Sequence, residues 1–504
     1  VGDVVQVTFL GFKSQDLTIG EADNYVITLE EDAAQLEEVV VVGYGTQKKA
    51  DLTGAITTVS SEDISRTPTG SAMESLQGKV AGLQIVSSGG PGSGPTVRIR
   101  GIGSYTSGAS NPLYVVDGMF FDDISFINTQ DVESISVLKD ASASAIYGVR
   151  AANGVVIIQT KSGKYDMKPQ ITYDGYSGVH RAQNVVKMAN SEQFSTYVME
   201  TGSAPDIQFL QNAMQRYGRS RINPNVPAVN TDWYEEILRY GFIQSHSISA
   251  MGGGDRATYS IGANYFSEEG ILDMKNEYER FNLRSKLEFQ ISDRLTIGGN
   301  AILSNATRYD PESSAWRTAY YAVPVMPVFD PNNTEATPIN YANARHLGYR
   351  SPQNPFPTMD LSENRNKIRN IVANFYAELE VIPEKLNFRT SYNHSFETFD
   401  RRELRLPYDI GEGSNRNEAT LLKRNEIFSN QIWDNTLTYT DSYGAHDLTV
   451  LVGSSFRDEA WDLLQAQGAG FPLTNPASYF IDQAETIFED SVRDDAAREY
   501  GLSY

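Results

Sequence analysis

Long runs of alternating apolar and polar residues dominate the second half of the chain. In the run 281–291, the odd-numbered residues are apolar apart from Ser285, and the five even-numbered residues are polar or charged. Alternation of this kind predicts a β-strand whose two faces lie in different surroundings. Five successive polar positions do not fit a globular core. They fit a transmembrane barrel strand, which turns one face to lipid and the other to the lumen.

Eight further runs share this alternation, so nine strands are predicted in all. The clear runs cover 257–266, 295–304, 371–380, 386–396, 431–440 and 447–456. Weaker runs cover 171–180 and 242–251.

The connections between the predicted strands alternate between short and long. The short ones cover 252–255, 292–293, 381–385 and 441–445. The long ones cover 181–241, 268–278, 309–366, 402–425 and 461–504. Outer-membrane barrels combine short periplasmic turns with long extracellular loops, whereas a soluble β-sandwich has no reason to keep this order. The pattern therefore predicts an antiparallel transmembrane β-barrel.

Residues 51–164 have a different sequence pattern, which predicts short apolar strands and helices of small residues. In 133–160, a helix is predicted at 141–147 and is ended by Gly148, and a fully buried strand is predicted at 155–158. On its own, this stretch is also compatible with an α+β unit of any enzyme.

Five motifs, in their order and spacing, resemble the TonB box and plug of SusC-like TonB-dependent outer-membrane transporters. They are EEVVVVGYG at 37–45, LQGKVAGL at 76–83, VRIRG at 97–101, LYVVDG at 113–118 and the stretch 133–160. The resemblance covers residues 1 to about 165 closely and the remainder in architecture only. It implies a mainly β fold: a barrel of about 22 strands with an α+β plug domain inside, preceded by a small periplasmic β-sandwich domain.

The resemblance also divides the chain into domains. Residues 1–31 correspond to the end of a carboxypeptidase-regulatory-like β-sandwich, 32–50 to a linker with the TonB box, 51–164 to the plug, and 165–504 to the first part of the barrel with its extracellular loops. Nine strands cannot close around a plug of this size, so we expect these residues to be part of a longer protein.

The valine run in the linker is the predicted coupling segment. Four β-branched residues between charges and glycines form a ready edge strand, to which a partner can add a strand through main-chain hydrogen bonds. An ordinary buried strand is the alternative. The predicted TonB box consists of Glu38, Val39, Val40, Val41 and Val42.

A second prediction concerns a latch between plug and barrel. In the run 97–100, apolar and cationic residues alternate, so Arg98 and Arg100 are expected on one strand face. The resemblance implies that such plug arginines pair with barrel-wall glutamates, in breakable but strong ion pairs. Solvated surface arginines are the alternative. The glutamates at predicted lumen positions are Glu288, Glu378 and Glu380.

Substrate contacts are expected from the upper plug loops and from the long loop 309–366. The plug candidates are Ser104, Tyr105, Asn111, Met119 and Phe120, and the loop candidates are Trp316, Tyr320 and Tyr321. Aromatic faces beside amide side chains suit carbohydrate and also suit peptide, and aromatic loop residues can serve loop packing instead. The prediction favours an oligosaccharide over a peptide.

Composition restricts the function further. The chain has 64 acidic and 42 basic residues and a formal charge of −22, which argues against nucleic-acid binding. It has no cysteine, and its five histidines show no ligand spacing. No catalytic motif is found. The chain is therefore predicted to be no enzyme, with no catalytic residues, metal site or cofactor, and a soluble β-rich hydrolase is the least favoured alternative.

The resemblance thus implies active import of a nutrient across the outer membrane, with the plug and the N-terminal part on the periplasmic side. The implied partners are TonB, energised through ExbB and ExbD, a SusD-like surface lipoprotein, the lipid bilayer and the oligosaccharide or peptide substrate. A surface receptor or signal transducer of the same fold, which binds ligand without bulk import, is the alternative function.

Overall fold

The computed structural model describes residues 56–503, except 68, 88, 104–109, 352–353, 412–413, 445, 472–474 and 477–478, and four short strands before residue 56. The chain forms two compact units. The first comprises residues 1–87, 94–124 and 131–161, and the second comprises 88–93, 125–130 and 162–504. The second unit therefore includes two short segments from the early part of the chain.

The first unit is built on a five-stranded sheet. Its order is β5 (Ile56–Ser60), β10 (Val132–Leu138), β11 (Val155–Thr160), β8 (Leu113–Val116) and β9 (Met119–Phe121). Strands β8 and β11 run parallel, and the other neighbours run antiparallel. Three antiparallel pairs accompany the sheet: β1 (Val4–Val7) with β2 (Gln15–Thr18), β3 (Val39–Val42) with β4 (Gly45–Lys48), and β6 (Leu83–Val86) with β7 (Thr96–Ile99).

Short helices connect these strands. They are α1 (Ser61–Ser65), η2 (Glu74–Leu76), η3 (Thr129–Asp131), α2 (Ala141–Ser144) and η4 (Ala145–Ala151). Of the predicted β-sandwich tail and linker at 1–50, only strands β1 to β4 are described, and the predicted domain boundaries stay predictions.

The two central strands of this sheet carry its core. Ile135 in β10 and Val155, Val156 and Ile158 in β11 have no exposed surface. An almost continuous apolar run suits a strand that is covered on both faces, and the predicted buried strand at 155–158 is confirmed.

The predicted helix at 141–147 is only partly correct. It starts as α2 and continues in 3-10 geometry as the first part of η4, up to Gly148, where the helical conformation is interrupted. Gly148 has φ +66°, a left-handed conformation that glycine adopts without a steric penalty. The glycine therefore ends the first helical stretch, as predicted, and a second short stretch follows to Ala151.

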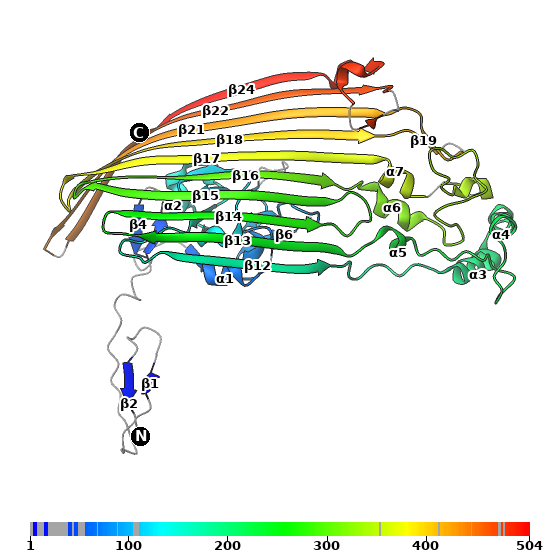
Figure 1. Ribbon diagram of the computed structural model, residues 1–504, viewed down its shortest axis with the longest axis horizontal. Helices are drawn as coiled ribbons and strands as arrows, with labels where there is room; N and C mark the ends of the chain where they lie inside the picture. The colour runs from blue at the N-terminus through cyan, green and yellow to red at the C-terminus, as the bar shows by residue number, and fades with distance from the viewer. Residues whose placement is uncertain are drawn as a thin grey trace. The chain divides into compact units, whose positions relative to one another are not determined.

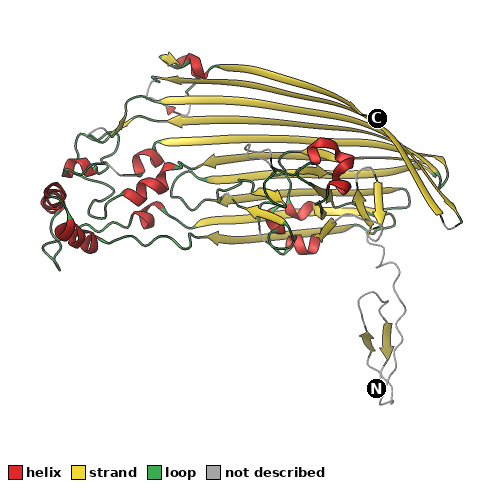
Figure 2. Ribbon diagram, turned by 180° about the vertical axis from the view of Figure 1, so that it is seen from behind, coloured by secondary structure: helices red, strands yellow, loops and turns green. Residues whose placement is uncertain are grey.

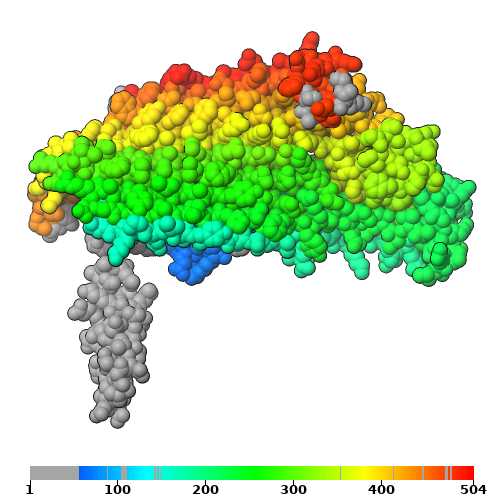
Figure 3. Space-filling model, in the orientation of Figure 1, coloured from blue at the N-terminus to red at the C-terminus, as the bar shows by residue number. Residues whose placement is uncertain are grey.

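The second unit is a large antiparallel sheet whose strands follow one another in sequence order (Figure 1). The strands are β12 (Gln170–His180), β13 (Gly241–Gly253), β14 (Ala257–Glu269), β15 (Glu277–Ser292), β16 (Leu295–Asp310), β17 (Ser362–Ile382), β18 (Leu386–Arg405), β21 (Thr420–Tyr443) and β22 (His446–Ala469). Two further strands, β23 (Thr486–Ile487) and β24 (Arg493–Ser503), both pair with β22. In the space-filling view these strands form a continuous surface (Figure 3).

All nine predicted strands are confirmed, and most extend beyond the predicted limits. The prediction of a loop throughout 461–504 is wrong, because β22 continues to Ala469 and β24 follows it. Strand β24 has the sequence RDDAAREYGLS, in which charged residues interrupt the apolar alternation. Its pairing with β22, and not its own pattern, identifies it as a strand.

The predicted order of connections is also confirmed. The connections β13–β14, β15–β16, β17–β18 and β21–β22 are two or three residues long, and the intervening ones are longer. Strand parity therefore places all short turns at one end of the sheet and all long connections at the other.

The two faces of the sheet have opposite chemistry. In β15, Arg280 and Arg284 are 2% and 1% exposed, whereas Phe281 and Leu283 are 52% and 39% exposed. On the apolar face Leu283, Leu303 and Ile371 lie in register across three strands. Polar residues inside and apolar residues outside are typical of a sheet that faces lipid on one side. We call these the lumen face and the lipid face.

The long connections contain helices that gather at one end of the strands (Figure 2). We call α3 to α7 the helical layer: α3 (Ser191–Thr201), α4 (Ala204–Tyr217), α5 (Trp233–Ile237), α6 (Ser314–Tyr321) and α7 (Phe356–Asp360). Side chains such as Phe209, Trp233 and Tyr341 form an apolar core of their own here. None of the described helices is long and apolar enough to cross a membrane.

The helices α3 and α4 begin at well-formed caps. Asn190 and Gln193 form a capping box at the start of α3, and Ser203 and Asp206 form one at the start of α4. The remaining short elements in these connections are η5 (Ala344–Leu347), β19 (Tyr408–Asp409), β20 (Asn415–Arg416), η7 (Ile481–Gln483) and η8 (Glu489–Ser491).

Candidate functional site

The lumen face of β13 and β15 holds the segment 125–130. The Arg280 guanidinium donates a hydrogen bond to the backbone carbonyl of Ser125, and Asn282 Nδ2 donates to the carbonyl of Phe126 at 2.8 Å. Asn128 Nδ2 donates to Ser247 Oγ at 3.3 Å. The strand alternation aims these wall side chains at the segment, and Arg280 and Asn282 thereby satisfy the backbone carbonyls of Ser125 and Phe126.

The segment 88–93 meets the same face through Gly92. Its backbone N–H donates to Glu268 Oε2 at 3.2 Å. Gly92 has φ +61°, and a Cβ at this position would lie 2.2 Å from the ring of Tyr278. Glycine is therefore required both by the backbone conformation and by the close approach to the strand. We call Ser247, Glu268, Arg280 and Asn282 the polar wall.

The polar wall was only partly foreseen from the sequence. The alternation at 281–291 predicted that Asn282 faces the lumen, and the same period extended by one step includes Arg280. The segments that the wall contacts carry no signal of their own, because the acceptors at Ser125 and Phe126 are backbone carbonyls.

The predicted latch arginines do not share one strand face. Strand β7 ends at Ile99, and Arg100 has φ +57°, outside the extended region. The Arg100 backbone N–H bonds to the carbonyl of Gly82 at 2.8 Å, and its guanidinium forms an ion pair with Asp140. The prediction of a shared face is wrong because the strand turns after Ile99; Arg98 lies within β7.

The predicted latch glutamates lie at lumen-face positions, and Glu378 already has a cationic partner. Arg389 Nη1 lies 3.1 Å from Glu378 Oε2, and its guanidinium stacks 4.2 Å from the centre of the Tyr376 ring. Glu288 accepts hydrogen bonds from the hydroxyls of Tyr165, at 2.9 Å, and Tyr376. Pairing of Glu378 or Glu380 with Arg98 or Arg100 stays a prediction.

The residues predicted to contact substrate from the plug lie in different environments. Met119 is 3% exposed within β9, so its predicted substrate contact is wrong: the side chain belongs to the core of the first unit. Phe120 packs edge to face on Tyr147 at 6.0 Å. The backbone carbonyl of Asn111 accepts from Asn153 Nδ2 at 3.2 Å. Ser104 and Tyr105 lie outside the described residues.

The three predicted loop aromatics lie together on helix α6. Trp316, Tyr320 and Tyr321 are 36%, 50% and 59% exposed. The rings of Tyr320 and Tyr321 meet edge to face at 5.2 Å, and Trp316 lies 5.7 Å from Tyr234. Exposed, mutually supported rings are suited to stacking against a ligand.

The valines of the predicted TonB box form strand β3. Val39 pairs with Lys48 and Val42 with Gly45 in the antiparallel pair β3–β4. A two-stranded sheet leaves the second edge of each strand for another partner. Glu38 lies outside the described residues, and binding of this segment to TonB stays a prediction.

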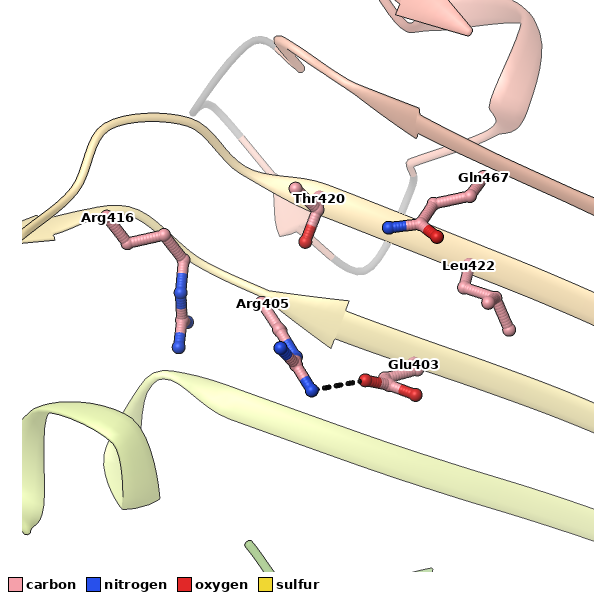
Figure 4. A pocket seen from close by; sticks show the side chains of 6 residues that line it. All are labelled: Glu403, Arg405, Arg416, Thr420, Leu422 and Gln467. Carbon is pink, nitrogen blue, oxygen red and sulfur yellow. Dashed lines mark ion pairs between the residues drawn. The ribbon is translucent and has the colours of Figure 1, made fainter. Parts of the chain in front are cut away.

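A charged pocket of about 380 Å³ lies at the end of the large sheet that carries the long connections (Figure 4). Strand β18 contributes Glu403 and Arg405, whose side chains form an ion pair at 2.8 Å, and β20 contributes Arg416. A second pocket of about 160 Å³ shares Glu403 and Arg405 as lining residues. Sequence reasoning missed both pockets, because their residues come from separate strands and loops.

Comparisons with known proteins agree with this fold. Residues 48–155 match the family described as the TonB-dependent receptor plug domain. A plug followed by a large antiparallel sheet, polar on one face and apolar on the other, defines a TonB-dependent β-barrel receptor. The predicted mainly β fold class with an α+β plug is confirmed.

Individual TonB-dependent receptors are similar to this chain. The chain is 33% identical over 488 residues to TonB-dependent receptor P3 of Formosa agariphila, covering 94% of this chain and 45% of the relative. It is 30% identical over 482 residues to the TonB-dependent receptor SusC of Bacteroides thetaiotaomicron, covering 90% and 45%. The solved structure of the RagAB peptide importer in its open-open state matches with a TM-score of 0.72 and 25% identity, covering 92% of this chain and 53% of that chain.

The chain is similar to SusC-like TonB-dependent receptors along most of its length, as its motifs indicated. Members of this family are outer-membrane β-barrel proteins, and the relatives found are receptors and transporters. The chain spans about half the length of the curated relatives it matches.

Proposed function

We propose that the chain serves TonB-dependent import of a nutrient across the outer membrane. The observation that carries the proposal is the polar wall, which holds two segments of the plug match, 88–93 and 125–130, by hydrogen bonds on the lumen face. The opposite face of the same strands is apolar and suited to lipid.

The hydrogen bonds between the polar wall and the two segments have a strength that suits a contact that opens and closes. Hydrogen bonds contribute about 0.5–1.5 kcal/mol net, and those to charged groups about 1.5–3 kcal/mol. The four contacts of the wall include two charged partners, Arg280 and Glu268. Together they hold the segments against thermal motion, yet water can replace each bond when the segments are pulled away. Such a contact can be opened and remade in every transport cycle.

The pulling force is assigned to TonB, energised through ExbB and ExbD, acting on Val39–Val42. A β-branched strand with one edge paired to β4 can accept a further strand at its other edge. The similarity to SusC and to the RagAB importer supports a SusD-like lipoprotein as the surface partner.

The substrate proposed from the sequence is an oligosaccharide, and the exposed rings of Trp316, Tyr320 and Tyr321 support a stacking surface for sugar rings. A peptide is the second candidate. It is favoured by the charged pockets around Glu403 and Arg405 and by the similarity to a peptide importer. A receptor that binds ligand without bulk import is the alternative for the whole protein.

The test is deletion of residues 38–42 from the full-length protein in its native host. We expect import of the nutrient to stop and ligand binding at the cell surface to remain, because the deletion removes the strand for TonB and leaves the barrel intact. Deletion of residues 32–36 is the matched control and should leave import largely unchanged. Normal import by the 38–42 deletion strain would overturn the proposal. Ligand binding without any import by the undeleted parent protein would favour the receptor.

A further inference from the structure

The two charged pockets adjoin each other on the lumen face. The register from β15 to β22 places Glu403, Leu422 and Gln467 on the same face of the sheet as Asn282 of the polar wall. The larger pocket is lined by Glu403, Arg405, Arg416, Thr420, Leu422 and Gln467 (Figure 4). These six residues include no aromatic ring on which a sugar could stack. We call the two pockets together the rim site.

The larger pocket has an excess of positive charge. Glu403 is shared between Arg401, at 2.7 Å, and Arg405, at 2.8 Å, so it compensates only one of two guanidinium groups. Arg416 is held by uncharged acceptors, the carbonyls of Leu361 at 3.1 Å and Leu406 at 3.0 Å. In the part of the chain that the structure describes, no carboxylate lies within ion-pair distance of Arg416.

The surroundings of Arg416 favour an incoming anion. Burial lowers the pKa of its guanidinium, and the charge of Arg405 acts in the same direction, while Tyr408 and Glu312 oppose the shift. Arg416 also stacks on Tyr408, with 5.3 Å between the guanidinium carbon and the ring centre. The stacking fixes the orientation of the planar group, which prepares it for a bidentate contact with a carboxylate.

The smaller pocket has the opposite character. Four acidic side chains, Asp310, Glu312, Glu363 and Glu403, line it together with Arg401 and Arg405, so acidic groups are in excess. Asp310 pairs with Arg308 at 2.8 Å, and Glu363 pairs with Lys275 at 3.0 Å.

Glu312 differs from these two acids. Its Oε1 accepts hydrogen bonds from the backbone N–H and the hydroxyl of Ser314, at 3.3 and 3.0 Å. Among the described residues, no cation lies within ion-pair distance of this carboxylate. Among the described residues, the smaller pocket thus contains a carboxylate that forms no ion pair, and the larger one contains a guanidinium that forms none. The two charges act on each other only at longer range.

We propose that the rim site binds a ligand that carries both a carboxylate and a cationic nitrogen, namely a charged peptide. Arg416 and Arg405 receive the carboxylate, and Glu312 receives the ammonium or guanidinium group. A neutral oligosaccharide would form an ion pair with neither of these partly buried groups, so it would gain less from the site than a charged ligand. The inference rests on the proposed import function and selects its second candidate substrate, a peptide, over the oligosaccharide, since the ligand held at the rim is the substrate awaiting import.

The test is calorimetric binding to the purified full-length protein in detergent. The probes are octapeptides of Ala, Ser, Lys and Glu with free termini, octapeptides of Ala, Ser and Gln with blocked termini, malto-oligosaccharides and oligogalacturonates. We expect the charged peptides to bind at least about tenfold more tightly than the other three probes. A factor of this size corresponds to the contribution of one charge-assisted hydrogen bond. Arg416→Gln and Glu312→Gln should each remove about tenfold of this affinity.

Matched controls are Arg221→Gln and Glu235→Gln, which remove exposed charges outside both pockets. They should leave every affinity unchanged. Thermal melting of all four variants shows whether they fold. Equal affinity for charged and neutral peptides, preferred binding of malto-oligosaccharides, or binding of no probe would overturn the proposal.

Preferred binding of oligogalacturonates that depends on Arg416 but not on Glu312 would assign the site to an acidic glycan and also overturn it. Binding in detergent needs no TonB. A protein that binds charged peptides but fails to import them would therefore contradict the proposed function alone.

Discussion

The polar wall and the helical layer are both buried parts of the second unit. The layer is buried by apolar packing, whereas the wall is buried in hydrogen-bonded contacts. In the layer, Phe209 and Trp233 are 1% and 3% exposed among apolar neighbours. In the wall, Arg280 and Asn282 are each 2% exposed, and their partners are backbone carbonyls. Apolar burial stabilises in proportion to area and without direction, whereas polar burial depends on every hydrogen bond being made.

This difference separates a permanent structure from an exchangeable contact. Separating the helices of the layer would expose its apolar core to water. The free-energy cost of this exposure is not offset by new hydrogen bonds to water. The contacts between the segment 125–130 and the wall are made by amides, carbonyls and one guanidinium, which water solvates on separation, although the segment also carries the buried side chains Phe126 and Ile127. The comparison therefore predicts that mutations in the layer affect folding, whereas mutations in the wall affect gating.

The largest effect is expected from Trp233→Ala in the layer. The change removes a buried ring and the hydrogen bond from its Nε1 to the carbonyl of Val323 at 2.9 Å, and should destabilise the layer by about 3–5 kcal/mol. Hydrogen exchange in α5 and α6 measures the loss. Tyr197→Ala, at a 66% exposed position of α3, is the control and should change little. Unchanged exchange in α5 and α6 would show that this core does not hold the layer together.

A smaller effect is expected from Arg280→Gln in the wall. Loss of a charge-assisted hydrogen bond to Ser125 should loosen the segment 125–130 by about 1.5–3 kcal/mol and leave the helical layer unaffected. Hydrogen exchange of residues 125–130 and dye entry into cells are the measurements. Arg294→Gln, in the short turn after β15, removes the same charge away from the wall. If 125–130 is as protected in Arg280→Gln as in the parent, the wall does not hold this segment.

Strand periodicity made most of the large sheet predictable. Every predicted strand recurs in the structure because lipid and lumen impose different chemistry on alternate residues, as Phe281 and Asn282 show. Strand β24 could not be recognised in this way. Its lipid-face residue Arg498 carries a charge that is compensated by Asp458 of the neighbouring strand, through two hydrogen bonds of 2.9 and 2.7 Å.

The functional contacts were less predictable, because they depend on residues far apart in sequence. Periodicity placed Arg98 and Arg100 on one face. Arg100 itself has a positive φ, however, and its side chain pairs with Asp140. The same periodicity identified the face of Asn282 but could not show that its partner is the carbonyl of Phe126. Likewise, Arg416 and Glu312 belong to different connections, and only the folded chain places them around adjoining pockets.

The central claim is that import requires release of the segment 125–130 from the wall. Asn128 and Ser247, whose side-chain atoms lie 3.3 Å apart, can both be changed to Cys in a chain that has no cysteine and joined by a short reducible bis-methanethiosulfonate crosslinker. Cysteines at Ser245 and Asn264, 3.4 Å apart on two wall strands that are already paired, form the control crosslink.

The measurement is nutrient uptake by cells carrying each crosslinked receptor, before and after addition of reductant. We predict that the crosslink between positions 128 and 247 stops import, leaves surface binding intact, and is reversed by reductant, while the control crosslink has little effect. Import at the parent rate with the 128–247 crosslink in place would contradict the account.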